Sequence, residues 1–177
     1  MKLFLGNYNT QLKCDELLNQ VKSNTDVEYF HAHQNITEEE NESTEHLRSL
    51  GYNENNVKFK HYSFGTHFDS WFAEEFGRIV NVTPVICVVS SIEPGCMVPW
   101  HVDHNPWEDE HSSKGELHRY MCFIDKPQNG HIFMVENQSF YYEEQGNIYE
   151  YPSMHSYHAG ANTGLTTKYL LTMTGYR

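Results

Sequence analysis

The second half of the chain is a series of short segments with strand character, and this pattern limits the possible folds more than any other feature. After Pro84, residues 85–89 form a run rich in β-branched side chains, as expected for a buried strand. Similar segments follow at residues 117–124, 131–135, 139–142, 147–151 and 165–174, with turn signals such as Asn129-Gly130 and Gln145-Gly146 between them. Many short strands at close spacing predict an all-β sandwich or barrel.

The first half of the chain shows helical spacing in place of strand alternation. Leu17, Leu18 and Val21 are spaced as on a short amphipathic helix over residues 15–22, and large apolar residues recur every three to four positions over residues 68–80. Residues 34–56 are the most polar stretch and indicate a solvated helix with a loop, the alternative being a mobile lid over a site. We therefore expect a single domain over residues 1–177, with a mixed helix-and-loop part at 1–83 and a β core at 84–177.

The composition argues against two classes of partner. The formal net charge is -12 and no stripe of Lys and Arg is present, so a nucleic-acid partner is not expected. The apolar runs are far shorter than the roughly 18 residues of a membrane helix, so no membrane partner is expected either. The cysteines show no CxxC spacing and fit buried thiols in a reducing, cytoplasmic compartment: Cys14, Cys87, Cys96 and Cys122.

A His-x-Asp pair, His101 and Asp103, lies beside a candidate strand. In an extended segment residues i and i+2 share a face, so both side chains can point to one side while Val102 points away. A late histidine can complete this pair, and both His155 and His158 follow the segment at 147–151. Two imidazoles and one carboxylate on one face of a metal ion leave other positions open, an arrangement typical of non-haem Fe(II) oxygenases. The pair therefore predicts an iron site.

Lys168 lies ten residues after His158, on the segment expected to form the last strand. If its side chain faces inward, strand alternation also turns Thr166, Leu170 and Thr172 inward. The same alternation turns the opposite set toward the helices: Leu165, Tyr169, Leu171 and Met173. A polar-lined interior under an apolar outer face suits a cofactor pocket.

With His101, Asp103, His158 and Lys168 in this order and spacing, residues 84–177 resemble the double-stranded β-helix of the Fe(II)/2-oxoglutarate-dependent dioxygenases. The resemblance implies that the two histidines and the aspartate bind Fe(II), and it favours His158 over His155, because only His158 has a lysine at the family spacing. It implies that Lys168 pairs with the far carboxylate of the cosubstrate 2-oxoglutarate, and that O2 is used to hydroxylate a substrate. The implied fold is mainly β with a helical coat (α+β), a double-stranded β-helix of the jelly-roll, cupin-like kind.

The resemblance leaves the subfamily and the substrate open. A lysine anchor is similar to collagen-type prolyl hydroxylases, whereas residues 116–120 and 158–162 are similar to aspartyl/asparaginyl β-hydroxylases. Many relatives have Ser or Thr where this chain has Leu170, and β-hydroxylases of the aspartyl type lack the carboxylate ligand present here as Asp103. The implied substrate is a peptide or protein side chain, or a free amino acid.

Several further side chains are candidates for the site. Arg119 could be a second cation for the cosubstrate carboxylates, because a planar guanidinium pairs with a carboxylate through two hydrogen bonds, or it could form an ordinary surface ion pair. Tyr120 is a candidate hydrogen-bond partner of 2-oxoglutarate. His104 is expected at the mouth or exposed, the alternative being a role as ligand or as partner of a ligand, and His118 is expected to be structural or partly exposed. Trp100 and Trp107 flank the motif and could line a substrate cleft or serve in packing.

Two other functions fit parts of the same pattern. A cupin-like module could bind a metal or a sugar without oxygenase turnover, and it would have no need for Lys168. A purely structural β-sandwich would carry its histidines incidentally. The oxygenase is the function that gives a role to both histidine ligands, the carboxylate and the lysine.

Overall fold

The computed structural model describes residues 3–23, 27–31, 45–53, 55–62, 71–103 and 114–177, and its centre is two antiparallel β-sheets. The larger sheet has seven strands in the order β1-β9-β6-β11-β4-β3-β2, and the smaller has four in the order β5-β10-β7-β8. The strands of the larger sheet are β1 (Leu3–Asn7), β2 (Val27–His31), β3 (Lys58–Tyr62), β4 (Thr83–Ile92), β6 (Leu117–Cys122), β9 (Asn147–Glu150) and β11 (Lys168–Tyr176). Those of the smaller sheet are β5 (Met97–His101), β7 (His131–Val135), β8 (Gln138–Phe140) and β10 (His158–Asn162).

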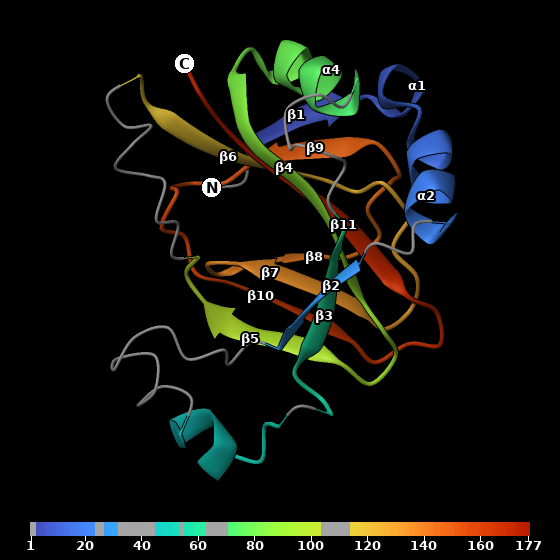
Figure 1. The fold of residues 1–177 in the computed structure, drawn as a ribbon, viewed down its shortest axis with the longest axis vertical. Helices are drawn as coiled ribbons and strands as arrows, with labels where there is room; N and C mark the ends of the chain where they lie inside the picture. The colour runs from blue at the N-terminus through green and yellow to red at the C-terminus, as the bar shows by residue number, and fades with distance from the viewer. Residues whose placement is uncertain (1–2, 24–26, 32–44, 54, 63–70, 104–113) are drawn as a thin grey trace.

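Three helices lie on the side of the larger sheet, as Figure 1 shows. They are α1 (Asn9–Leu12), α2 (Cys14–Ser23) and α4 (Trp71–Val80). The helices predicted over residues 15–22 and 68–80 are therefore confirmed as α2 and α4, with residues 68–70 of the second outside the described residues. Within the described part of residues 34–56, residues 45–49 are helical. Among the described residues, no helix is both long and apolar enough to cross a bilayer.

The strands expected after Pro84 are confirmed. β7 begins and ends as predicted, and β4, β6, β8 and β9 overlap their predicted segments. β11 begins three residues later than expected, because the side chain of Asn162 closes a turn before it. The Asn162 Nδ2 donates to the carbonyl of Thr166 at 2.8 Å, and its Oδ1 accepts from the Gly164 N–H at 3.0 Å. Leu165 in this turn is exposed, so it does not face the helices as alternation had predicted.

The first half of the chain contributes strands that its sequence pattern did not indicate. We expected helix and loop over residues 1–83, but β1 pairs with β9 on one side of the larger sheet, and β3 and β2 extend it beyond β4 on the other. Each of these strands has five residues, too few to predict a strand from local pattern alone. β1, β2 and β3 form strands because they pair with neighbouring strands of the sheet, so tertiary contacts outweigh local strand propensity in these segments.

Two apolar clusters hold the layers together. One lies between the helices and the larger sheet and includes Phe72, Phe76, Leu171 and Met173, which confirms that Leu171 and Met173 face the helices. The other lies between the two sheets and is made of Met121, Phe123, Phe133, Val135, Phe140, Tyr149, Tyr151 and Leu170. Burying a side chain of this size stabilises the fold by about 1.5–3 kcal/mol. The interior between the sheets is therefore largely apolar and aromatic, which corrects the expectation of a polar lining. Lys168 is a buried, ionisable exception next to this cluster.

Candidate metal centre

Two histidines and an aspartate meet at one end of the smaller sheet. His101 and His158 are direct partners in the antiparallel ladder between β5 and β10, and their ring centroids are 4.2 Å apart. Asp103 follows β5 and places Oδ1 3.3 Å from the His101 Nε2 and Oδ2 3.6 Å from the His158 Nε2. One ligand atom from each residue lies within 4.8 Å of the other two. The structure thus brings together the three predicted ligands.

Backbone carbonyls orient both imidazoles. The Nδ1 of His101 is 2.8 Å from the carbonyl oxygen of Pro99, and the Nδ1 of His158 is 3.0 Å from that of Ser156. A carbonyl oxygen can only accept, so each Nδ1 carries a proton, and in the neutral form of either ring the Nε2 has the free lone pair. Such a partner on the far nitrogen is typical of metal-binding histidines. Both Nε2 atoms are turned toward Asp103, so the donor atoms converge.

The protonation states of this cluster suit a cation. Burial lowers the pKa of His158 to about 3, with the nearby charges of His101 and Arg119 adding to the effect. Burial alone would raise the pKa of Asp103, but the hydrogen bond from His101 and the positive charge of Arg119 outweigh it and hold the pKa well below the usual range. At neutral pH His158 is therefore neutral and Asp103 is ionised, the forms in which these side chains bind a metal.

Arg119 lies beside the cluster, on β6 of the larger sheet. Its Nη1 forms an ion pair with Oδ2 of Asp103, and its guanidinium lies 4.9 Å from the centroid of the Tyr151 ring. Only 9% of the Arg119 side chain is exposed, so this is not the surface ion pair considered from the sequence. The structure brings Arg119 to the candidate ligand Asp103.

Lys168 is the first residue of β11 and is buried between the sheets. Its Nζ donates to the carbonyl of Ile132 at 2.7 Å and lies 4.8 Å from the centroid of the Phe133 ring. No carboxylate in the described part of the chain forms an ion pair with it, and burial lowers the pKa of Lys168 to about 7. The side chain faces inward, as expected.

Gly160 shows where this ammonium lies relative to the three ligands. A Cβ atom at Gly160 would be 3.1 Å from the Lys168 Nζ. Gly160 follows His158 by two residues and shares its inward face on β10, a step of about 7 Å along a strand, so the ammonium lies beside the strand two residues beyond His158. The absence of a side chain at Gly160 leaves room for the lysine head group beside the strand.

Tyr120 does not line the site. Its ring is fully buried in the cluster under the helices, 6.4 Å from the Phe76 ring, and its hydroxyl accepts a hydrogen bond from Arg177 at 2.8 Å. Neighbouring residues of a strand face opposite sides, so Tyr120 faces the helices because Arg119 faces the interior. This corrects the prediction that Tyr120 contacts 2-oxoglutarate.

The remaining histidine and tryptophan candidates lie away from the three ligands or outside the described residues. His155 is exposed, and its backbone N–H is bound by the Ser153 hydroxyl. His118 is half-buried and pairs with Glu150 at 2.6 Å, in keeping with the structural position expected for it. Trp100 is exposed on β5. His104 and Trp107 lie outside the described residues.

His61 on β3 is a neighbour of the cluster that the sequence did not indicate. Burial lowers the pKa of His61 to about 4, and the charges of Asp103, Arg119 and His101 also act on it, which places it within electrostatic range of the cluster. Its ring lies 4.8 Å from that of Phe59, two residues earlier on the same face of β3. The alternation of Phe59 and His61 with lysines was the available signal, but no strand was expected there.

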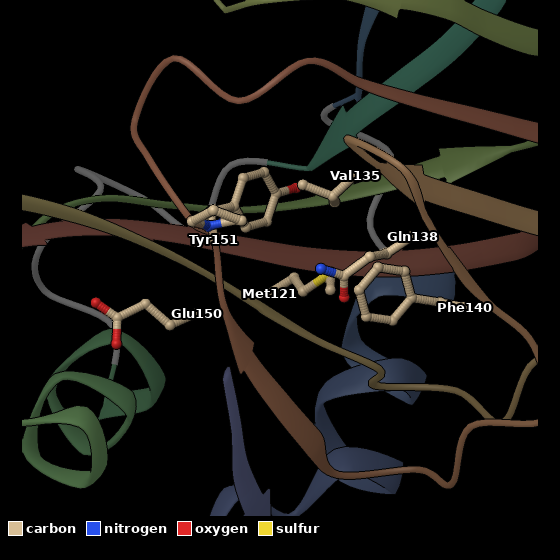
Figure 2. Close-up of a pocket in the computed structure, with 7 residues that line it drawn as sticks. Met121, Val135, Gln138, Phe140, Glu150 and Tyr151 are labelled. Atoms are coloured by element: carbon tan, nitrogen blue, oxygen red, sulfur yellow. The ribbon is translucent and has the colours of Figure 1, made fainter. Parts of the chain in front are cut away.

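A small pocket between the sheets adjoins the cluster. It is lined by Met121, Val135, Gln138, Phe140, Glu150, Tyr151 and Pro152. Figure 2 shows Met121, Gln138 and Phe140 gathered on one side of it, with the Glu150 carboxylate turned away. Val135 is the ladder partner of His158 on β7, and the Tyr151 ring lies 5.7 Å from the His158 ring. The pocket therefore begins directly beside the candidate ligand His158.

Comparison with known proteins supports the fold. No protein-family model and no curated protein matches the chain. Among solved structures, AviO1 from Streptomyces viridochromogenes Tue57 is 12% identical and has a TM-score of 0.50, with 99% of this chain and 89% of that chain covered. The two facing sheets, with β4, β6, β9 and β11 opposite β5, β7, β8 and β10, are the halves of an eight-stranded jelly roll. This chain has the double-stranded β-helix fold.

Two further solved structures, both of prolyl hydroxylases, match the chain with lower TM-scores. The viral collagen prolyl hydroxylase of Paramecium bursaria Chlorella virus-1, solved with 2-oxoglutarate, is 12% identical with a TM-score of 0.49, covering 99% of this chain and 96% of that one. A prolyl-4-hydroxylase of Pseudomonas putida is 9% identical with a TM-score of 0.45, and the match covers 93% of this chain and 99% of that one. The arrangement of the two facing sheets confirms the fold implied by the sequence resemblance.

Proposed function

We propose that this chain is an Fe(II)- and 2-oxoglutarate-dependent oxygenase that hydroxylates a peptide or protein side chain, or a free amino acid. The convergence of the Nε2 atoms of His101 and His158 with the carboxylate of Asp103 carries the proposal, because this donor set is the facial triad of non-haem Fe(II) oxygenases. The carbonyl partners on both Nδ1 atoms add to it, since they hold the two imidazoles in the metal-binding tautomer.

His158 and Asp103 fit an Fe(II) ion in charge as well as in ligand type. His158 is neutral and Asp103 is ionised, so binding a divalent cation requires no proton to leave either group at neutral pH. Bound iron, together with 2-oxoglutarate and O2, would supply the oxidising power for hydroxylation, with 2-oxoglutarate converted to succinate and carbon dioxide. The protein would orient these molecules and exclude bulk water.

Lys168 is the proposed anchor of the cosubstrate. A buried ammonium with no carboxylate partner among the described residues is costly, and the distal carboxylate of 2-oxoglutarate would neutralise it. The ammonium lies beside Gly160, one two-residue step of about 7 Å along β10 from His158, and a short dicarboxylate can span such a step between the metal and the lysine. Arg119 is already paired with Asp103, so Lys168 is the better candidate of the two cations.

The substrate class follows from the sequence resemblance to prolyl and aspartyl/asparaginyl hydroxylases. A peptide or protein side chain is favoured over a free amino acid on that analogy. Hydroxylation at a carbon is the default reaction of these families.

An anaerobic titration tests the proposal. Adding Fe(II) and 2-oxoglutarate to the protein should produce the weak visible charge-transfer band of the chelated cosubstrate, and admitting air should then produce succinate. Asp103→Ala should abolish the band, Lys168→Ala should mainly weaken 2-oxoglutarate binding, and Glu74→Ala on the exposed face of α4 should change neither. Folded, iron-loaded protein that gives neither the band nor succinate would overturn the assignment.

A further inference from the structure

Arg119 connects the larger sheet to the candidate ligands at the end of the smaller sheet. Its Nη1 pairs with Oδ2 of Asp103, although Arg119 lies on β6 and Asp103 follows β5. The exposed fractions of the two side chains are 9% and 30%, so the pair is largely shielded from water. A shielded, charge-assisted contact of this kind is stronger and more directional than a surface ion pair.

The guanidinium is also held from its other side. It lies 4.9 Å from the centroid of the Tyr151 ring, and the backbone N–H of Tyr151 donates to the carbonyl of Arg119 at 2.8 Å. The Tyr151 ring in turn meets the His158 ring edge to face, with centroids 5.7 Å apart at 72°. Asp103, Arg119, Tyr151 and His158 thus form a continuous chain of contacts that joins the carboxylate to the distal histidine.

We propose that Arg119 is a positioning residue, which holds Oδ2 of Asp103 so that the carboxylate presents Oδ1 to the metal beside the Nε2 of His101. Oδ1 lies 3.3 Å from that Nε2, whereas Oδ2 is the oxygen engaged by Arg119. Hydrogen-bonded partners of metal-binding carboxylates fix their orientation in this way. The inference deepens the proposed oxygenase function and rests on it.

Whether removal of Arg119 weakens or tightens metal binding distinguishes a positioning role from a purely electrostatic one. A guanidinium near a cation repels it, so if the charge of Arg119 were its main influence, removing it would tighten metal binding. If Arg119 positions Asp103, removing it weakens metal binding, and the loss is about 10- to 100-fold for residues of this kind.

The affinity for Mn(II), measured without 2-oxoglutarate by the loss of the free-ion electron paramagnetic resonance signal, tests the proposal. We expect Arg119→Gln to bind Mn(II) about 10- to 100-fold more weakly than the unmodified protein. Arg119→Lys keeps the charge and one donor and should recover part of the affinity. Tyr151→Leu removes the ring under the guanidinium and should cause a smaller, several-fold loss while leaving residue 119 in place. It also keeps the proposal testable if Arg119→Gln fails to fold.

Two outcomes would overturn the inference. The first is a folded Arg119→Gln protein that binds Mn(II) as tightly as the unmodified protein, or more tightly. The second is unchanged Mn(II) affinity with a loss of 2-oxoglutarate affinity, which would make Arg119 a cosubstrate anchor. A purely structural role would lower the melting temperature without changing Mn(II) affinity. If the unmodified protein itself binds no Mn(II), the proposed function fails, and that result is distinct from both outcomes.

Discussion

His158 faces His101 directly across the ladder between β10 and β5, with the ring centroids 4.2 Å apart, although the two residues belong to segments far apart in the sequence. The antiparallel pairing of these strands decides which late histidine can reach the His-x-Asp pair. His155 precedes β10, is exposed, and has no such ladder partner.

The two late histidines should therefore differ sharply in their effect on metal binding. We expect His158→Ala to lower the affinity for Mn(II) by at least about 100-fold, because it removes one of the three ligands, whose Nε2 points toward Asp103. His155→Ala should leave the affinity within about twofold, and it serves as the matched control. The two titrations can be compared by isothermal calorimetry, and equal losses in both variants would contradict the assignment.

Replacing Lys168 by methionine should stabilise the metal-free protein, and more at low pH than at high pH. Burial lowers the pKa of Lys168 to about 7, whereas the pKa in the unfolded chain is near 10.5. Between these values the unfolded chain binds the proton and the folded chain does not, so the free energy of unfolding rises with pH. The destabilisation caused by burying Lys168 is therefore greatest below pH 7 and decreases as the pH rises.

Urea unfolding at several pH values measures this effect. The advantage of Lys168→Met over the unmodified protein should narrow by about 1.4 kcal/mol per pH unit between pH 7 and pH 9. The exposed Lys126 provides the control, since Lys126→Met should show no such narrowing. A constant difference across this range would mean that folding does not lower the pKa of Lys168.

Binding of 2-oxoglutarate should take up a proton above pH 7. The Lys168 ammonium is mostly deprotonated at pH 8 in the folded protein, and pairing with the distal carboxylate restores its charge. Calorimetry of the Mn(II) form at pH 8, in buffers of different ionisation enthalpy, should show an uptake of up to about 0.9 proton. Lys168→Arg remains charged throughout, so any binding that it retains should show no uptake.

Tyr120→Phe should leave 2-oxoglutarate affinity unchanged. The hydroxyl of Tyr120 is bound by Arg177 on the helix side of β6, away from the candidate ligands. Loss of this hydrogen bond should lower the free energy of unfolding by about 0.5–1.5 kcal/mol. Urea unfolding measures the free energy of unfolding, and a binding titration measures the affinity for 2-oxoglutarate. Weaker 2-oxoglutarate binding with unchanged stability would show that Tyr120 contacts the cosubstrate.

Arg119 and Tyr120 show what strand alternation can and cannot predict about the site. Adjacent residues of a strand cannot both face the interior, so alternation allows only one of the two to line the site. The sequence leaves open which one it is, because both side chains have polar atoms and long reach. The register of β6 against β11 and β9 turns Arg119 inward and Tyr120 toward Phe76.

The strands before β4 are elements that the local sequence did not predict at all. β1, β2 and β3 were not foreseen, since segments of five residues have little strand preference of their own. Pairing with β9 and β4 supplies the hydrogen bonds that make them strands. His61 was missed for the same reason, because its position near the candidate ligands depends on β3.

The amino-acid sequence by itself determined the succession of strands after Pro84 and the shared face of His101 and Asp103. Each follows from a two-residue period or a turn within a short segment, and such local preferences act whatever the rest of the chain does. Only the tertiary structure decided that His158 meets His101, that Arg119 holds Asp103, and that the interior is apolar. These relations depend on which distant strands pair and in which register, and that is set by burying two apolar clusters at once.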